Sequence, residues 1–312
     1  MHEKVPFAPG GRGGWRVLSE SDLDRVVALA ARVAAHDGGL PATATGEFLR
    51  RRYVGLGEER RAFAVGAFAG DRLVACGARR PVAEGTMITG LVDPDHRQRG
   101  LGGTLFALLT EASGGASGPL LLETESLKPH GEAFLAARGL VRTFAEDVLR
   151  LGPDTAPPAV PLPGGITPEE WSDTNRADFH AAYRASFADR PGFPDPTLHA
   201  WTVWLVDDTF LPGCSLLART ADGTPVAFVT CAEEYVVQLG VAPGHRRTGL
   251  GRALATAALH RLRAHGHGEV YLDVNTDNPA SAALFRGLGF APLTRRARFA
   301  GGGRHGTAGD GE

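Results

Sequence analysis

One segment occurs twice in this chain of 312 residues, and the repeat constrains the fold more than any other feature. The segment from Val92 to Gly102 returns as Val241 to Gly251, at an offset of 149 residues. The match extends upstream, where Glu84 pairs with Glu233. Solenoid repeats have periods of about 20–50 residues, whereas an offset of 149 residues is the size of a whole domain. The repeat therefore predicts a duplicated domain.

The boundary between the two copies is visible in the composition. A Pro-rich stretch over 152–165 is typical of a semi-extended linker. It separates an N-terminal domain at 1–151 from a C-terminal domain at 166–300. The Gly-rich end, 301–312, has almost nothing to bury, and we expect it to be disordered.

The overall composition is that of a globular protein with little net charge. Hydrophobic residues make up 43% and charged residues 22%, which excludes disorder of the whole chain. A formal net charge of -2 gives no basic excess for nucleic acid or an anionic membrane. No apolar run resembles a membrane helix or a signal-peptide core. The three cysteines form no CxxC pair and no His pair has metal-ligand spacing, so we expect no metal and a cytoplasmic location.

Hydrophobic periodicity predicts the same order of elements in both halves. In the second half, strands are expected at 225–231, 235–241 and 270–274, with helices at 249–265 and 279–286. The first half repeats this order, and it adds a helix at 21–35 after a short strand. Each half is therefore predicted to be a mixed α/β domain.

In both halves, Arg-x-x-Gly-x-Gly lies between a predicted strand and a predicted helix. Glycines let the backbone approach a ligand closely and adopt unusual torsions. The first N–H groups of a helix have no partner inside the helix, so they point toward an anion placed at its start. Arg97 and Arg246 would add a charge-assisted contact. The pattern favours a pyrophosphate site; the alternative for a single copy is a plain strand–helix turn.

Two other phosphate-binding motifs are excluded by the residues themselves. A Walker loop needs Gly-Lys-Ser/Thr, which neither copy contains. A dinucleotide fold needs a third glycine three residues further on, where Leu105 and Leu254 stand instead.

The second half resembles the GNAT superfamily of acyl-CoA-dependent N-acyltransferases. Its signature Gln/Arg-x-x-Gly-x-Gly/Ala is present at 246–251, and a later signature is present at 275–290. The first half keeps the glycine loop but has 123–129 in place of the Asn-rich stretch, so it is the weaker copy. The whole chain resembles tandem, two-domain members of the superfamily, of the mycothiol synthase type.

The resemblance implies two tandem GNAT-like domains, each a twisted mixed sheet whose central parallel strands splay apart, flanked by helices. Acetyl-CoA would lie in the splay, and the second half would be catalytic while the first is degenerate or structural. In the second half the resemblance implies cofactor contacts at Leu239, Val241, Arg246, Arg247, Thr248, Gly249, Leu250, Gly251, Arg252, Asn275, Asn278 and Phe285. In the first half it implies them at Val92, Arg97, Gly100 and Gly102.

Transfer of an acyl group to an amine requires a proton acceptor, because an alkyl amine has a pKa of about 10.4. A carboxylate can take that proton. Glu233 and Glu234 precede the strand at 235–241, and strand alternation would let only one of them face the cleft. The repeat favours Glu233, because Glu84 matches it while Glu234 aligns with a glycine. The alternative is a pair of solvated carboxylates at a turn.

Many members of the family carry a tyrosine as general acid at the position of Phe285, which has no hydroxyl. Ser281, Tyr271 or solvent remain as alternatives, and Phe285 is also expected to be core. Asn278 precedes Pro279 and is expected to cap a helix, whether or not it also contacts the cofactor.

The stretch 186–210 is rich in aromatic and acidic residues, which would suit a cationic amine above the acceptor site. The helical spacing of Leu198, Trp201 and Leu205 favours core packing instead, above all for Trp201.

These observations predict an enzyme, an acetyl-CoA-dependent N-acetyltransferase that acts on the amine of a small molecule. Two alternatives remain open: acetylation of a protein or peptide amine, and a non-catalytic acyl-CoA-binding regulatory protein. We expect a small-molecule amine as partner, no nucleic acid, no membrane, and a monomer or homodimer.

Overall fold

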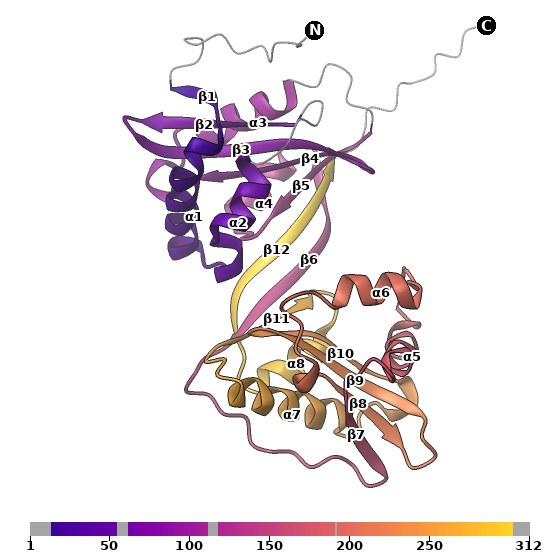
Figure 1. Ribbon diagram of the computed structural model, residues 1–312. Helices are drawn as coiled ribbons and strands as arrows, with labels where there is room; N and C mark the ends of the chain where they lie inside the picture. The colour runs from indigo at the N-terminus through magenta and orange to yellow at the C-terminus, as the bar shows by residue number, and fades with distance from the viewer. Residues whose placement is uncertain (1–13, 55–61, 112–117, 191, 302–312) are drawn as a thin grey trace, which may run out of the picture. The chain divides into compact units, whose positions relative to one another are not determined.

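The computed structural model describes residues 14–54, 62–111, 118–190 and 192–301, and the chain divides into two compact units (Figure 1). Unit 1 comprises Met1–Asp147 together with Leu293–Glu312, and unit 2 comprises Val148–Pro292. The division follows the repeat except at the end of the chain. There the last strand, which the sequence assigned to the C-terminal domain, belongs to unit 1.

Unit 1 is a mixed sheet with the strand order β1-β2-β3-β4-β5-β12-β6. Its strands are β1 (Trp15–Val17), β2 (Phe63–Ala69), β3 (Arg72–Val82), β4 (Gly85–Val92), β5 (Leu120–Thr124), β6 (Leu140–Leu151) and β12 (Ala291–Gly301). Its helices are α1 (Leu23–Asp37), α2 (Gly46–Leu49), α3 (Leu101–Glu111) and α4 (Pro129–Ala136). The buried apolar residues of α1 recur at helical spacing, which directs one face of the helix into the core.

The strand β12 is inserted into the sheet of unit 1 although it follows unit 2 in the chain. It pairs antiparallel with β5, from Ala297 opposite Thr124 to Gly301 opposite Leu120. Phe299, which is 2% exposed, packs into a core cluster with Leu135 of α4. Sequence similarity between the copies could not reveal that β12 joins the sheet of unit 1, because strand pairing is set by contacts far apart in the chain.

Unit 2 repeats the plan. Its sheet begins with the last four residues of β6 and continues in the spatial order β11-β10-β9-β8-β7. Its other strands are β7 (Ile166–Glu170), β8 (Leu216–Thr220), β9 (Pro225–Ala232), β10 (Tyr235–Val241) and β11 (Val270–Asn275). Its helices are α5 (Arg176–Phe187), α6 (Leu198–Leu205), α7 (Leu250–Ala264) and α8 (Pro279–Arg286). One core cluster packs the sheet against α7 and α8, and a second, aromatic cluster packs it against α5 and α6.

Both units contain a central pair of parallel strands that part. In unit 1, β4 and β5 pair over three positions, ending at Ile88 opposite Leu122. In unit 2, β10 and β11 pair at one position, Tyr235 opposite Tyr271. The predicted fold, two mixed α/β domains with splayed central strands, is confirmed.

The Pro-rich segment 152–165 contains no helix or strand and is bonded to unit 2. Arg263 of α7 donates to the carbonyl of Gly152 at 2.6 Å, and a hydrogen bond of 2.8 Å joins His260 to the carbonyl of Pro157. The segment therefore packs along α7. Of the tail expected to be disordered, Gly301 is the last residue of β12, and 302–312 lie outside the described residues.

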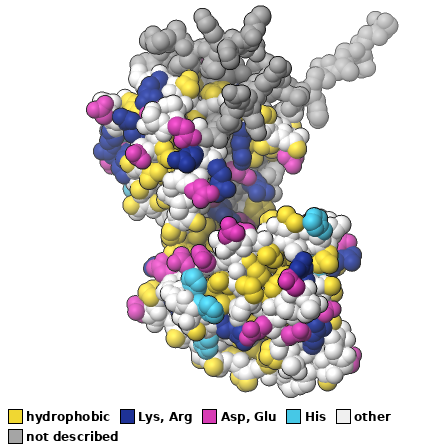
Figure 2. Space-filling view, viewed as in Figure 1, with side chains coloured by type: hydrophobic (Ala, Val, Ile, Leu, Met, Phe, Trp, Pro, Cys, Tyr) yellow, Lys and Arg dark blue, Asp and Glu magenta, His cyan; other side chains and the backbone are white. Residues whose placement is uncertain are grey.

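Charges of both signs are mixed on the surface. On the face shown in Figure 2, Lys and Arg side chains lie beside Asp and Glu in each unit. Within the part of the chain that the structure describes, no helix is both long and apolar enough to cross a membrane. The same part contains no cluster of His, Cys, Asp or Glu arranged to hold a metal ion.

Candidate active site

The two glycine loops have the same backbone conformation. Gly249 has φ 89° and Gly100 has φ 82°, and each precedes a long helix. Two residues earlier, Arg247 (φ 65°) and Gln98 (φ 60°) are also left-handed although neither is glycine. Such torsions turn backbone N–H groups toward one another and form a concave site for an anion. A Cβ at either position would meet nothing within 4 Å, so space does not require glycine there. The positive φ does, because residues with a side chain rarely adopt it.

The start of α7 is open to an anion. Gly249 is the N-cap residue and no side chain caps the helix there, so the first N–H groups of α7 have no side-chain partner at the cap. Gly251 lies where α7 approaches β10, and a Cβ there would come within 3.3 Å of Val241 Cγ2. Leu250, in contrast, is buried in the core, and Thr248 donates its hydroxyl to the carbonyl of His245.

The first arginine of each motif holds the loop in place. Arg246 donates to Asp189, to the carbonyl of Ser186 and to the carbonyl of Val241. Arg97 donates to both oxygens of Asp37, at 2.9 and 2.6 Å, and to the carbonyl of Val92. Each guanidinium therefore ties its loop to the C-terminal end of the first helix of its unit, α1 or α5. The phosphate contact expected of these two arginines stays a prediction, and the structure adds these protein partners to it.

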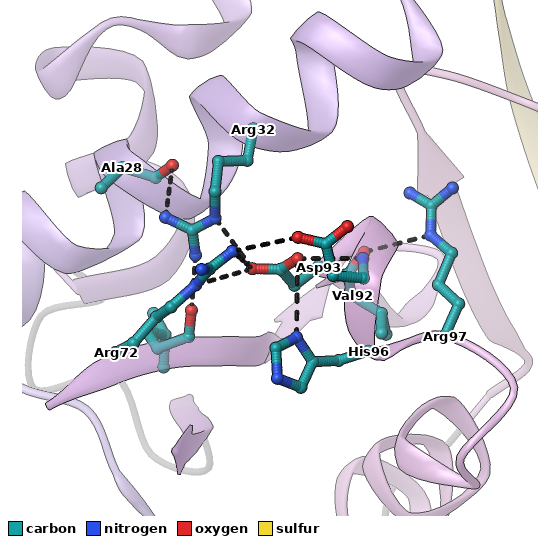
Figure 3. Close-up of polar contacts among 9 residues, drawn as sticks. Ala28, Arg32, Arg72, Val92, Asp93, His96 and Arg97 are labelled. Atoms are coloured by element: carbon teal, nitrogen blue, oxygen red, sulfur yellow. Dashed lines mark hydrogen bonds and ion pairs between the residues drawn. The ribbon is translucent and has the colours of Figure 1, made fainter. Parts of the chain in front are cut away.

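A buried carboxylate anchors the loop of unit 1. Asp93 follows β4 directly and is 0% exposed (Figure 3). Arg32 donates to it at 2.8 Å from α1, Arg72 at 2.9 Å from β3, and the backbone N–H of Asp95 at 3.1 Å. Although burial opposes ionisation, these donors hold the pKa of Asp93 at about 2. The corresponding residue of unit 2 is Ala242, so that loop has no buried carboxylate at this position.

Unit 1 contains a cavity of about 970 Å³ beside its loop. Its wall includes Val92, Arg97, Gly100 and Gly102, all four of the residues predicted to hold a cofactor in this half. The apolar side chains of α3 and α4 form another part of the wall. A cavity of this size is typical of a small-molecule or cofactor site. The weaker copy has therefore kept a space for a ligand.

The cavity ends in a charged cluster at the point where β4 and β5 part. Arg52 is paired with Glu125 at 3.1 Å and with Glu123 at 3.6 Å. It also donates to the hydroxyl of Thr89 at 3.3 Å, and the hydroxyl of Tyr53 lies 3.4 Å from the same oxygen. Sequence reasoning missed this cluster, because Arg52 lies in a helical segment outside both signatures.

The two glutamates expected to serve as base lie in the turn between β9 and β10. Both are exposed, and Glu234 has φ 57°. The alternation argument that separated their faces was therefore wrong, because it applies to a strand and these residues form the hairpin turn. The backbone N–H of Glu233 donates to the carbonyl of Thr209 at 2.9 Å, which fixes this residue against the end of α6.

The remaining predicted residues of unit 2 lie around the splay and the start of α8. Asn278 caps α8 by accepting from the N–H of Ser281 at 3.1 Å, as predicted. Asn275 at the end of β11 accepts from the N–H of Asp277. Arg252 of α7 donates to the carbonyl of Gly287. Leu239 and Val241 of β10 are half-buried beside the core, and Arg247 is exposed.

Two aromatic residues near the site have other partners. Phe285 is 4% exposed and packs edge-on against Phe290, so it belongs to the core as the sequence also allowed. The hydroxyl of Tyr271 donates to Glu269, which directly precedes β11. Burial and this glutamate raise the pKa of Tyr271 to about 12, which makes it a weak proton donor.

Trp201 is 2% exposed, which confirms its predicted core position. Its indole N–H donates to Gln238 Oε1 at 3.2 Å, across from α6 to β10. Gln238 was not among the predicted site residues. Its only signal in the sequence is its place three residues after Tyr235, on the strand expected to line the splay.

Comparison with known proteins identifies the family. Residues 172–290 match the model of the acetyltransferase (GNAT) family. A mycothiol acetyltransferase of Frankia alni is 30% identical over 308 residues, covering 89% of this chain and 91% of that protein. A GCN5-related N-acetyltransferase structure from Sphaerobacter thermophilus has a TM-score of 0.71 at 21% identity, covering 92% of this chain and 94% of the other. A tandem GNAT protein from the clavulanic acid biosynthesis pathway has a TM-score of 0.61 at 19% identity, with 92% and 97% covered.

The chain belongs to the GNAT superfamily, in its tandem form, and is an acetyl-CoA-dependent N-acetyltransferase that acts on a small-molecule amine. Acetyl-CoA supplies the acetyl group as a thioester. The chain's own features fit this donor: open N–H groups at the start of α7, left-handed residues in both loops, and parting strands in both units.

Proposed function

We propose that unit 2 carries out the transfer and that the acceptor is related to mycothiol, namely mycothiol without its acetyl group. The family model matches unit 2 alone, at residues 172–290, and this observation carries the assignment of halves. The name of the Frankia relative supports the acceptor. In unit 2 the first N–H groups of α7 bind the pyrophosphate of acetyl-CoA, and the backbone of β10 between Tyr235 and Val241 holds the pantetheine.

The chemistry requires a proton acceptor for the amine. Glu233 in the β9–β10 turn takes the proton, and the free amine then attacks the thioester carbonyl. Backbone N–H groups of the parting strand stabilise the oxyanion. The C–S bond of the intermediate then breaks, coenzyme A leaves as a thiolate, and the proton lost by the attacking nitrogen neutralises it. Because the conjugate thiol has a pKa near 8.5, by analogy with cysteine, a protein acid is not essential. This assignment agrees with the absence of a hydroxyl at Phe285.

Unit 1 holds a second acyl-CoA molecule in its cavity without transferring the acetyl group. The wall residues around the Gly100 loop support this binding. The cluster of Arg52, Glu123 and Glu125 supports the lack of turnover, because both carboxylates already have Arg52 as a partner. The three cysteines, free and buried, support a cytoplasmic location.

The test is release of thiol from acetyl-CoA by the purified protein, measured against a panel of amines. The panel contains deacetylated mycothiol, D-glucosamine and a peptide with a free N-terminus and a lysine. We expect turnover with deacetylated mycothiol and a product heavier by one acetyl group in mass spectrometry. Faster turnover of the peptide would favour a protein acetyltransferase. Binding of acetyl-CoA without turnover of any amine would favour a regulatory protein.

A further inference from the structure

We infer that Gln238 is a specificity-determining residue of unit 2: its amide N–H, aimed by Trp201, donates a hydrogen bond to an oxygen of the amine substrate. The inference rests on the proposed function in one respect, the assignment of transfer to unit 2. It adds a residue that contacts the acceptor rather than the acetyl donor. It also adds a substrate property, an oxygen near the amine.

The position of Gln238 follows from an irregularity in β10. The pairing of β10 with β9 shifts register between Val236 and Gln238. A bulge of this kind re-aims the neighbouring side chains. Val237 packs against the aromatic cluster beneath α5 and α6, and Gln238 meets Trp201 of α6. Gln238 therefore points to the α5–α6 side of the sheet, just beyond the point where β10 leaves β11.

The orientation of the amide is determined by its partner. An indole N–H can only donate, so the atom of Gln238 that faces Trp201 is the oxygen. The amide nitrogen with its two N–H groups then points elsewhere. Among the described residues, none accepts a hydrogen bond from it. Trp201 is itself fixed, because it is 2% exposed and its ring packs against Trp171, Tyr183 and Phe228.

The direction of the Gln238 side chain indicates a contact with the amine substrate rather than with acetyl-CoA. Ladder N–H and C=O groups lie in the plane of a sheet, whereas side chains stand perpendicular to it. A molecule wedged between β10 and β11 therefore meets backbone groups. The Gln238 amide instead faces a molecule that arrives on the α5–α6 side. Since an N–H donor recognises a lone pair, that molecule carries a hydroxyl, carbonyl or ether oxygen.

Three substitutions separate the orientation of the amide from its role as a donor. Gln238→Glu keeps an oxygen for Trp201 but has no N–H, and Gln238→Met keeps the length without either group. Trp201→Phe keeps an aromatic ring and removes the donor that orients the amide. Kinetics are measured with deacetylated mycothiol, with D-glucosamine, and with cyclohexylamine, a six-membered ring amine that carries no oxygen.

We expect the wild type to prefer the two oxygen-bearing amines over cyclohexylamine. Both Gln238 variants should lower kcat/KM for those amines by about tenfold, the value of one hydrogen bond. They should leave KM for acetyl-CoA and turnover of cyclohexylamine unchanged. Trp201→Phe should show part of the same loss. Thermal unfolding confirms that each variant is folded.

A variant Gln238→Glu that keeps the wild-type preference would overturn the inference while leaving the proposed function intact. Equal loss with all three amines, or a raised KM for acetyl-CoA, would also overturn it, because the residue would then serve the donor or the fold. No acetylation of any of the three amines by the wild type would instead contradict the proposed function, and the inference with it.

Discussion

The two units share a loop conformation but anchor it by different means. In unit 1 three buried carboxylates surround the loop and the start of α1: Asp22, Asp37 and Asp93 are 1%, 7% and 0% exposed. In unit 2 Asn175 and Asp189 make the contacts that match those of Asp22 and Asp37, Ala242 aligns with Asp93, and the side chain of Asp189 is 47% exposed. A loop of one shape is thus held by buried carboxylates in one copy, and by an exposed ion pair in the other.

The pair Asp22 and Asn175 shows how close the two solutions are. Asp22 accepts from the N–H of Ser19 at 3.1 Å, and Asn175 accepts from the N–H of Ser172 at 2.9 Å. Asp22 also accepts two bonds from Arg16, whereas Asn175 donates to Glu169. The turn before α1 and the turn before α5 are therefore closed by the same hydrogen bond. The difference between Asp22 and Asn175 indicates that this turn needs a side-chain oxygen as hydrogen-bond acceptor, whether or not that side chain is charged.

The largest expected effect is a loss of turnover that depends on which of the two glycine loops is changed. Gly251→Glu places a carboxylate at the pyrophosphate end of α7, so we expect turnover to be abolished and acetyl-CoA affinity in unit 2 to fall more than tenfold. Gly102→Glu, its partner in the repeat, should spare turnover and reduce the number of acetyl-CoA molecules bound. Thiol release and calorimetry measure the two quantities.

Gly251→Ala is the control for the fold, because it adds the Cβ that meets Val241 without adding the charge. If Gly102→Glu abolished turnover while Gly251→Glu spared it, the roles of the two units would have to be exchanged.

The second expected effect distinguishes the two glutamates of the β9–β10 turn. Glu233→Gln should lower turnover by about 10²–10⁴-fold, because the amine loses its proton acceptor. The acidic limb of the pH–rate profile should disappear, with KM for acetyl-CoA unchanged. Glu234→Gln, its neighbour in the same turn, is the matched control and should keep most of the activity. The reverse result would assign the base to Glu234.

A third, smaller effect compares the two loop clamps. Asp37→Asn removes one carboxylate of a nearly buried ion pair with Arg97 and should destabilise unit 1 by about 1–3 kcal/mol. Asp189→Asn removes the corresponding partner of Arg246 at the surface, and should leave stability within experimental error of the wild type. Thermal and urea unfolding measure both. Equal losses would show that exposure does not distinguish the clamps.

The smallest expected effect is a difference in acid sensitivity between the units. The pKa values of Asp22 and Asp93 are both lowered to about 2, by a hydrogen bond from Arg16 and by the Arg32–Arg72 pair respectively. A carboxyl group with a lowered folded pKa stabilises the fold above its unfolded pKa of about 3.9, and this stability is lost as pH falls toward 2. We therefore expect unit 1 to lose stability first below pH about 4.

Hydrogen exchange resolved by unit, between pH 5 and pH 2.5, measures this order. In the double variant Asp22→Asn with Asp93→Asn, unit 1 should be less stable at pH 7 and should change less with pH than in the wild type. Earlier opening of unit 2 in the wild type would contradict the comparison.

Local sequence patterns predicted the helices and strands and their order, because these elements depend on periodicity and glycine placement within a few residues. The strands and helices around both loops lie within a few residues of their predicted ranges, and Asn278 caps α8 as expected. The interactions that the sequence could not show are those between distant segments: Arg52 with Glu125, Arg97 with Asp37, and Trp201 with Gln238.

The error at Glu233 and Glu234 has a similar cause. A hairpin turn and the first residues of a strand look alike in sequence, and only the left-handed torsion of Glu234 distinguishes them. Likewise, the repeat gave the number of domains but not the partner of the last strand, since similarity between copies contains no information on which sheet a strand completes.

The placement of β12 has a consequence for synthesis of the protein. Its residues Leu293–Gly301 leave the ribosome only after the whole of unit 2, yet they pair with β5, which was made more than 170 residues earlier. The sheet of unit 1 therefore remains incomplete until unit 2 has been synthesised, with the edge of β5 unpaired on the side that β12 will occupy. Nascent chains that stall within unit 2 would expose this edge, which is a site for aggregation or capture by a chaperone.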